Sequence, residues 1–279
     1  MSRRGHLLVM LRGPKMHSET NELVDVLGGR ILVRIYRPRT GRLPFHLFIH
    51  GGGWCIGGLD ERDPRCRTIA AEADCVVVSV EYRLAPENMF PTAPEDCYRA
   101  LEWIVEEAER LDIDPSRISV GGESAGGNLA AVLCLIARDR NGPRIAFQWL
   151  DVPAVDLTMS QPSVSSTPPG FMLDYEQMVE FRDAYLPSVA TQTEPYASPF
   201  HAMDLSGLPP ASILTCGADP LRDDGRAYAG RLRDAGVTVF DRHLAGHVHP
   251  SFAFTRIATA EEDQRDAIAL LRAVLWPVD

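Results

Sequence analysis

The pentapeptide GESAG occupies residues 122–126, between a short apolar run at 118–120 and a helix-forming stretch that continues to about residue 138. It matches the pattern G-x-S-x-G, whose glycines permit a strand-to-helix turn too tight for larger side chains beside the serine. Such a turn exposes the hydroxyl of Ser124 at its tip. A serine that merely caps the helix is the alternative, but the strand–turn–helix context favours Ser124 as a nucleophile.

A second glycine motif, HGGGW at residues 50–54, follows an apolar run earlier in the chain. Consecutive glycines let backbone N–H groups turn toward one point and approach an anion closely. Donors fixed in this way form an oxyanion hole, which stabilises the charge that develops during acyl transfer. A merely flexible turn is the alternative, but the loop precedes the serine as a hydrolase requires. We expect His50 to anchor this loop by hydrogen bonding rather than to act as a base.

A serine nucleophile needs an acid and a base, which follow it in that order in hydrolases of this kind. Asp219 comes directly after the apolar run 212–216, where an acid at the end of a strand should lie. Asp223 and Asp224 compete with it, but they fall within the next predicted helix. We expect these two carboxylates in the solvated first turn of that helix.

Three histidines follow this acid: His243, His247 and His249. His243 ends the predicted strand 237–243, so we expect it to be structural. The other two lie in the predicted loop 245–251, at the carboxyl edge of the sheet, where such folds build their sites. These positions alone leave His247 and His249 both open.

Strands and helices alternate along most of the chain. Short runs rich in β-branched residues are typical of strands buried on both faces, and repeated strand–helix units predict an open, mostly parallel sheet with helices on both faces. The predicted strands are 23–27, 31–36, 45–50, 75–82, 118–120, 145–150, 212–216 and 237–243; the predicted helices are 63–73, 93–111, 124–138, 222–235 and 259–275.

Residues 156–210 break this alternation, with recurrent prolines, no strand signal and one predicted helix at 174–186. An insertion this long in a compact domain usually covers a site, so we expect a cap. Its apolar side chains suit an uncharged acyl group or, equally, the cap's own packing. They are Pro162, Pro168, Pro169, Phe171, Met172, Tyr175, Met178 and Phe181.

The composition excludes several classes of function. The chain has 279 residues, 45% hydrophobic and 24% charged, and a formal net charge of -10. We therefore expect one soluble domain, with neither nucleic acid nor a membrane as partner. Six cysteines without a C-x-x-C pair are expected to be reduced and mostly buried, and the lack of a signal-like apolar stretch predicts a cytoplasmic protein. Neither H-E-x-x-H nor a G-x-G-x-x-G that opens a βαβ unit occurs, so no metal or cofactor is expected.

In four motifs the chain resembles the bacterial hormone-sensitive-lipase-like esterases, a family of the α/β-hydrolase fold. The motifs are HGGGW (50–54), EYRLAPE (81–87), GESAGG (122–127) and DPLRD (219–223). The resemblance extends from about residue 22 to the end of the chain. It implies an α/β-hydrolase fold for residues 1–279, with a mostly parallel central sheet, helices on both faces and a small cap before the acid-bearing strand. The cap elements would lie at about 1–20 and 157–207.

The resemblance also assigns roles to single residues. It implies Ser124 as nucleophile, Asp219 as acid and His249 as base, since His249 stands at the family's spacing behind Gly246. It implies an oxyanion hole made by the backbone N–H groups of Gly52, Gly53 and Ala125, and substrate contacts from Trp54 and Phe252.

Three departures from the family pattern stand out. Pro250 follows His249 where the family has glycine, and proline biases the preceding residue toward extended backbone. Glu123 stands where aspartate is common. The segment before the first strand is shorter than in most members, so we expect a pocket that is more open on that side.

The resemblance implies hydrolysis of small-molecule esters with short-to-medium acyl chains, through an acyl-enzyme. An amide or formamide hydrolase is an alternative, because the same triad and glycine loop serve both reactions. A non-catalytic small-molecule receptor is a further alternative, but receptors derived from this family have lost the base, and a histidine is present here. Members of the family often form homodimers through the last strand and the C-terminal helix, a pairing that this sequence alone does not indicate.

Overall fold

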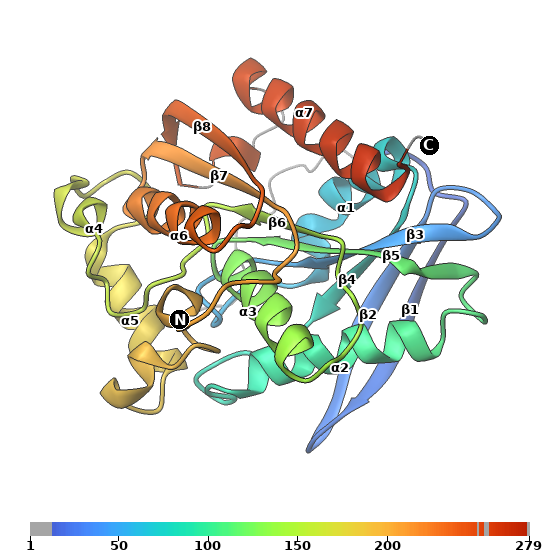
Figure 1. The fold of residues 1–279 in the computed structure, drawn as a ribbon, viewed down its shortest axis with the longest axis horizontal. Coiled ribbons are helices and arrows are strands. Elements are labelled where there is room, and N and C mark those ends of the chain that lie inside the picture. Colours follow the sequence, from blue (N-terminus) through green and yellow to red (C-terminus); the bar gives the residue numbers. More distant parts are fainter. Residues whose placement is uncertain (1–12, 250, 254–256, 278–279) are drawn as a thin grey trace.

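The computed structural model describes residues 13–249, 251–253 and 257–277, and within them eight strands form a single sheet (Figure 1). The strands are Ser18–Val26 (β1), Gly29–Arg37 (β2), Leu43–Ile49 (β3), Val76–Glu81 (β4), Ile113–Glu123 (β5), Phe147–Asp151 (β6), Ala211–Ala218 (β7) and Val239–Val248 (β8). Their order in the sheet is β1-β2-β4-β3-β5-β6-β7-β8. β1 and β2 form a hairpin, β2 pairs antiparallel with β4, and every later pair is parallel. This is the mostly parallel sheet of an α/β hydrolase, as predicted.

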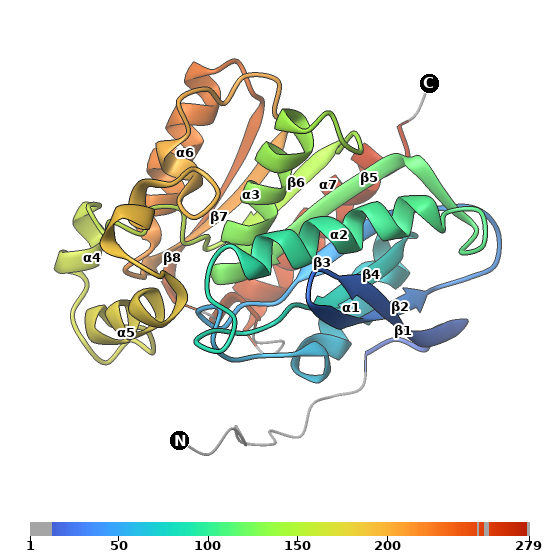
Figure 2. The same ribbon diagram turned by 90° about the horizontal axis from the view of Figure 1, so that it is seen from below.

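Helices cover both faces of the sheet. They are Leu59–Ala73 (α1), Thr92–Glu106 (α2), Ala125–Asp139 (α3), Pro162–Ser166 (α4), Tyr175–Tyr185 (α5), Arg222–Asp234 (α6) and Ala258–Leu275 (α7), with short 3-10 turns at Val189–Thr193, Pro199–His201 and Ser251–Ala253. Figures 1 and 2 show α1 and α7 on one face and α2, α3 and α6 on the other.

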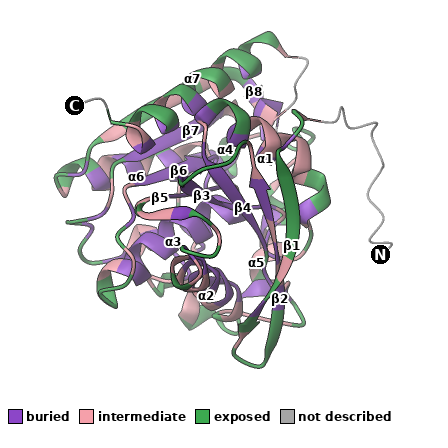
Figure 3. Cartoon of the chain, turned by 90° about the vertical axis from the view of Figure 1, so that its right-hand side faces the viewer, coloured by how far each residue is buried: buried purple, intermediate pink, exposed green. Residues whose placement is uncertain are grey.

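The side chains of β3 show how two cores arise from one strand. Phe45, Leu47 and Ile49 join the apolar core that includes α2 and α3, whereas Phe48 joins a second core with α1 and α7. Successive strand residues point to opposite faces, so a strand covered on both sides must be apolar at nearly every position. In Figure 3 the buried residues concentrate in these central strands. Five of the six cysteines are buried and all six are free thiols, as expected.

The last strand is longer than predicted. β8 extends to Val248, so His247 lies in the strand and not in a loop. β8 pairs with β7 alone, and its register shifts between Cys216 and Ala218. An edge strand of this kind alternates polar and apolar residues irregularly, which hid its second half from the sequence pattern.

The segment between β6 and β7, residues 152–210, is called the cap segment below. It contains no strand, as expected, and its main helix is α5, close to the predicted 174–186. In Figure 1 it lies on the left of the molecule, beyond the ends of the central strands. The expected N-terminal cap element falls largely on residues 1–12, outside the described residues. Among the helices that are described, none has the length and apolar composition that a membrane crossing needs.

Candidate active site

Ser124 occupies a strained turn between β5 and α3. Its backbone has φ 56° and ψ -119°, and its N–H donates to the Asp151 carbonyl at 2.8 Å. A Cβ atom on Gly122 would stand 2.4 Å from the carbonyl oxygen of Ile49, and one on Gly126 would stand 2.1 Å from the same oxygen. Both positions therefore require glycine, because no side chain fits at those separations. The turn holds the Ser124 hydroxyl at the carboxyl edge of the sheet.

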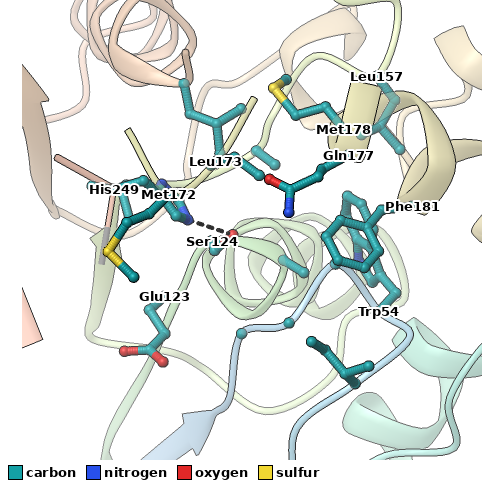
Figure 4. Close-up of a pocket in the computed structure, with 18 of the residues that line it drawn as sticks. Trp54, Glu123, Ser124, Leu157, Met172, Leu173, Gln177, Met178, Phe181 and His249 are labelled. Atoms are coloured by element: carbon teal, nitrogen blue, oxygen red, sulfur yellow. Dashed lines mark hydrogen bonds between the residues drawn. The ribbon is translucent and has the colours of Figure 1, made fainter. Parts of the chain in front are cut away.

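A hydrogen-bonded chain links the serine to a histidine and an aspartate (Figure 4). Nε2 of His249 lies 3.1 Å from Oγ of Ser124, and Nδ1 of His249 lies 2.9 Å from Oδ2 of Asp219. Asp219 is completely buried, and its other carboxylate oxygen accepts the N–H of Leu221 at 2.8 Å. A carboxylate can only accept, so Nδ1 donates to Asp219 and leaves Nε2 to accept the serine proton. This arrangement can deprotonate the hydroxyl as it attacks.

The other two histidines are engaged elsewhere. His247 contacts Ser251 Oγ through Nδ1 at 3.0 Å and Thr259 Oγ1 through Nε2 at 2.7 Å. His243 contacts Thr215 through Nδ1, in keeping with a structural role. Of the three candidates, only His249 contacts Ser124. Pro250, whose effect on this loop was in question, lies outside the described residues.

The competing carboxylates behave differently from each other. Asp223 pairs with Arg222 near the surface, as expected. The expectation for Asp224 was wrong, because its side chain is 1% exposed and its Oδ2 accepts the N–H groups of Val155 at 3.1 Å and Asp156 at 3.0 Å. The first turn of α6 packs against the start of the cap segment instead of facing water. Burial raises the pKa of Asp224 well above its ordinary value.

The glycine loop after β3 faces the same cavity as Ser124. Gly52 and Gly53 have φ angles of 118° and 56°, in the region that favours glycine. A Cβ atom on Gly52 would stand 2.1 Å from the Ile56 carbonyl oxygen, and that close approach folds the loop back on itself. Both glycines and Ala125 line the cavity beside the serine.

His50 anchors this loop, as predicted. Its Nδ1 lies 2.8 Å from the Gly51 carbonyl, and its ring stacks on Tyr82 with centroids 4.4 Å apart. The Tyr82 hydroxyl in turn donates to the His50 carbonyl at 3.1 Å. Burial lowers the pKa of His50 to about 4, so the ring is neutral near pH 7 and Nδ1 donates to the carbonyl.

Several known proteins are similar to this chain in sequence and in fold. A family model described as the alpha/beta hydrolase fold matches residues 46–253. Carboxylesterase NlhH of Mycobacterium tuberculosis is 43% identical over 252 residues, which cover 88% of this chain and 79% of NlhH. The chain belongs to the hormone-sensitive-lipase-like family of α/β hydrolases.

Two further comparisons agree with that membership. Carboxylic ester hydrolase LipN of Mycobacterium tuberculosis is 42% identical over 245 residues, covering 85% of this hydrolase but 65% of LipN, so the chain spans slightly less than two thirds of that relative. The crystal structure of EstE1, a thermophilic carboxylesterase cloned from a metagenomic library, superposes with a TM-score of 0.93. It is 38% identical and the match covers 96% of this chain and 92% of EstE1.

The cavity of this hydrolase has a volume of about 260 Å³ and mostly apolar walls. Trp54 and Phe252 both line it, and Trp54, which is 4% exposed, stacks on Tyr185 of the cap segment with centroids 4.5 Å apart. Of the eight apolar cap residues for which substrate contact and cap packing were both open, three also line the cavity: Met172, Met178 and Phe181. Phe171 and Tyr175 are exposed instead.

Sequence reasoning missed the polar residues of the cavity wall. They are Arg62, Glu123, Asp156 and Gln177. A local signal was available for Gln177, because an aspartate followed three residues later by glutamine marks a capping box at a helix start. No comparable signal identifies Arg62, which reaches the cavity from α1, about sixty positions before the serine.

Buried charges surround the turn that carries Ser124. Glu123 pairs with Arg62 and with Arg65, and Arg65 also pairs with Asp151, which Arg242 binds from the opposite side. Burial alone would raise the pKa of Glu123, but Arg62 and Arg65 outweigh it and hold that pKa below its ordinary value. Arg242 and Arg65 lower the pKa of Asp151 against burial in the same way. Both carboxylates are therefore charged, and each is paired with two arginines.

Proposed function

We propose that this protein is a serine carboxylesterase that hydrolyses small-molecule esters with short-to-medium acyl chains through an acyl-enzyme. The hydrogen-bonded chain from Ser124 through His249 to Asp219, open to a cavity that the glycine loop also lines, carries this proposal. Family membership and the carboxylesterase names of the relatives support ester hydrolysis as the reaction.

In the proposed mechanism, Oγ of Ser124 attacks the ester carbonyl carbon while Nε2 of His249 takes the hydroxyl proton. Asp219 orients the imidazole and stabilises its charged form. The N–H groups of Gly52, Gly53 and Ala125 bind the oxyanion of the tetrahedral intermediate. Collapse of that intermediate expels the alcohol, which receives the proton from Nε2. Water then attacks the acyl-enzyme by the same steps, releasing the acid and restoring Ser124.

The size and lining of the cavity support the choice of substrate. Clefts for drug-sized ligands typically have volumes of roughly 300–1,000 Å³, and this cavity, at about 260 Å³, lies just below that range. Apolar walls favour an uncharged acyl chain, and the limited volume favours a short one. In this proposal, residues 157–207 act as the cap of a single hydrolase domain and close the acyl side.

The test is hydrolysis of p-nitrophenyl esters from acetate to laurate, with an aryl formamide in parallel. We expect turnover of the short esters by the wild type and losses of about 10⁴- to 10⁶-fold in kcat for Ser124→Ala and His249→Ala. His247→Gln is the matched control and should retain most activity, because His247 contacts Ser251 and Thr259 rather than the nucleophile.

Each alternative has its own signature in this experiment. Retention of most activity by Ser124→Ala would overturn the nucleophile, and an active His249→Ala with an inactive His247→Gln would move the base to His247. Cleavage of the formamide without cleavage of any ester would indicate an amide hydrolase. Tight binding of esters by the wild type without turnover would indicate a receptor.

A further inference from the structure

The amide of Gln177 is a hydrogen-bond donor in the cavity wall, next to the apolar side chains of Leu173, Met178 and Phe181. Gln177 is the third residue of α5, and its amide oxygen accepts the N–H of Asp174 at 3.2 Å. In return, the Asp174 carboxylate accepts the N–H of Gln177 at 3.0 Å. This reciprocal pair is a capping box, which satisfies two backbone donors at the start of a helix.

The capping box fixes which end of the amide faces the substrate. Only the amide oxygen can accept from Asp174, so the nitrogen is the end left over, and this removes the usual ambiguity of a glutamine side chain. Among the described residues, no protein acceptor binds Nε2 of Gln177. In Figure 4 this nitrogen points into the cavity above Ser124, between Leu173 and Phe181.

Gln177 lies on the side of the cavity where the acyl half of the ester would bind. His249 must give its proton to the leaving alcohol, so the alcohol lies on the side of Ser124 where His249 stands. Figure 4 shows Gln177 and Phe181 on the other side of Ser124. The acyl chain, which extends away from the leaving group, therefore passes beneath the free N–H groups of Gln177.

We propose that Gln177 determines acyl specificity by donating a hydrogen bond from Nε2 to an acceptor oxygen in the acyl chain. The preferred substrates are then esters of short acids that carry an ether or keto oxygen a few bonds from the scissile carbonyl, in place of a methylene group. This inference rests on the proposed esterase function. Beside Leu173 and Phe181, the amide of Gln177 offers such an oxygen a hydrogen-bond donor, while a plain alkyl chain leaves that donor without a partner.

The gain expected from this bond is modest because Gln177 is exposed in the free enzyme. Water satisfies the amide before substrate binds, so the net effect is the exchange of one hydrogen bond for another. For two neutral groups, we expect this exchange to raise kcat/KM for the oxygen-containing ester by about 3- to 10-fold over the alkyl ester. A buried, unhydrated donor would discriminate more strongly.

The experiment compares pairs of p-nitrophenyl esters of equal length that differ by one oxygen in place of one CH₂: methoxyacetate against butanoate, 3-methoxypropanoate against pentanoate, and 4-methoxybutanoate against hexanoate. For each pair, the ratio of kcat/KM values is measured in the wild type, Gln177→Glu and Gln177→Leu. Intrinsic differences in ester reactivity are the same for all three enzymes, so they cancel when the ratios are compared. Gln177→Glu keeps the capping box, since glutamate serves at that position, but removes the donor.

We expect the ether-to-alkyl ratio of at least one pair to fall by about 3- to 10-fold in both variants. Ratios that match the wild type in both variants for every pair would overturn the inference while leaving the esterase function intact. A fall in Gln177→Glu without one in Gln177→Leu would also overturn it, because repulsion from the new carboxylate, and not loss of the donor, would then be the cause. If the wild type cleaves none of the six esters, the proposed function itself fails.

Discussion

Arg65, the buried arginine that pairs with Glu123 next to Ser124, should support the folded state more than any exposed ion pair of this hydrolase. Nη1 of Arg65 lies 2.8 Å from Oε2 of Glu123, and its Nη2 binds Asp151. The side chain of Arg65 is 10% exposed, and those of Glu123 and Asp151 are 3% and 2% exposed. Its guanidinium also lies over three aromatic rings, those of Phe48, Trp149 and Phe252.

Arg65→Met removes the cation but keeps an unbranched side chain that can fill much of the same space. Removing one partner of a buried ion pair typically costs about 3–5 kcal/mol, because the other charge is left uncompensated. Here Glu123 keeps Arg62 and Asp151 keeps Arg242. We therefore expect a loss of about 3 kcal/mol in the free energy of unfolding near pH 7, at the low end of that range.

The loss should depend on pH in a defined direction. Arg65 helps to hold the pKa values of Glu123 and Asp151 below their ordinary values, so removing it raises both in the folded protein. The folded variant then binds protons at higher pH than the folded wild type. The stability difference between the two proteins must accordingly be largest near pH 7–8 and shrink as pH falls toward 4–5, where protonation relieves the unpaired charges.

Urea unfolding of both proteins between pH 8 and pH 4.5, followed by tryptophan fluorescence, measures this difference. Arg39→Met is the matched control, because Arg39 is 48% exposed in its pair with Asp74 and should cost about 0–1 kcal/mol. A loss below 1 kcal/mol for Arg65→Met, or a loss that does not change with pH, would refute the reasoning. Either result would mean that the two carboxylates do not depend on Arg65 for their charge.

Two further substitutions test the glycine loop and the buried carboxyl group of α6. Gly52→Ala should lower kcat on a short ester by about 10²-fold or more, because the new Cβ, 2.1 Å from the Ile56 carbonyl oxygen, displaces the proposed oxyanion donors. Steady-state kinetics measure the change in kcat, and a melting curve shows whether the variant is folded. A fall of less than tenfold in a folded variant would contradict this prediction. Asp224→Asn should cost little stability near pH 4–5, because an amide oxygen can still accept the N–H groups of Val155 and Asp156, and the stability of the variant relative to the wild type should rise toward pH 7. Because the pKa of Asp224 is raised in the folded protein, the contribution of Asp224 to the free energy of unfolding falls as pH rises. Urea titrations from pH 5 to 8 should show this pH dependence in the wild type and not in Asp224→Asn. The same pH dependence in both proteins would contradict the prediction.

The sequence predicted the sheet and the tight turn at Ser124 well because both depend on local constraints. Strands covered on two faces must be apolar at nearly every position, which makes β3 and β4 visible as mostly apolar runs, interrupted only by His46 in β3 and by Ser79 and the terminal Glu81 in β4. The turn at Ser124 tolerates only glycine at Gly122 and Gly126, because the carbonyl of Ile49 stands 2.4 Å and 2.1 Å from where their Cβ atoms would be. Because only glycine fits at these two positions, the G-x-S-x-G pattern can be recognised in a single sequence.

Features that depend on packing between distant segments were beyond such reasoning. Asp224 stands in the first turn of a helix, where carboxylates usually face water, but its turn packs against the backbone of Val155 and Asp156. Its position in the first turn predicts a favourable interaction of the carboxylate with the helix dipole, but it does not predict which segment packs against the side chain. The extension of β8 was hidden for a related reason, since an edge strand needs only one apolar face.

In the cap segment, Gln177 depends both on a local sequence signal and on packing between distant segments. The spacing of Asp174 and Gln177 is a local signal that marks the start of α5 and orients the amide. Whether that amide faces water or substrate depends on how α5 packs. Tyr185 stacks on Trp54 with an interplanar angle of 3°, and the ring of Phe181 lies 2.3 Å from where a Cβ on Gly53 would stand. These two contacts hold α5 against the glycine loop, so the absence of a side chain at Gly53 lets α5 come close enough for Gln177 in its first turn to line the cavity.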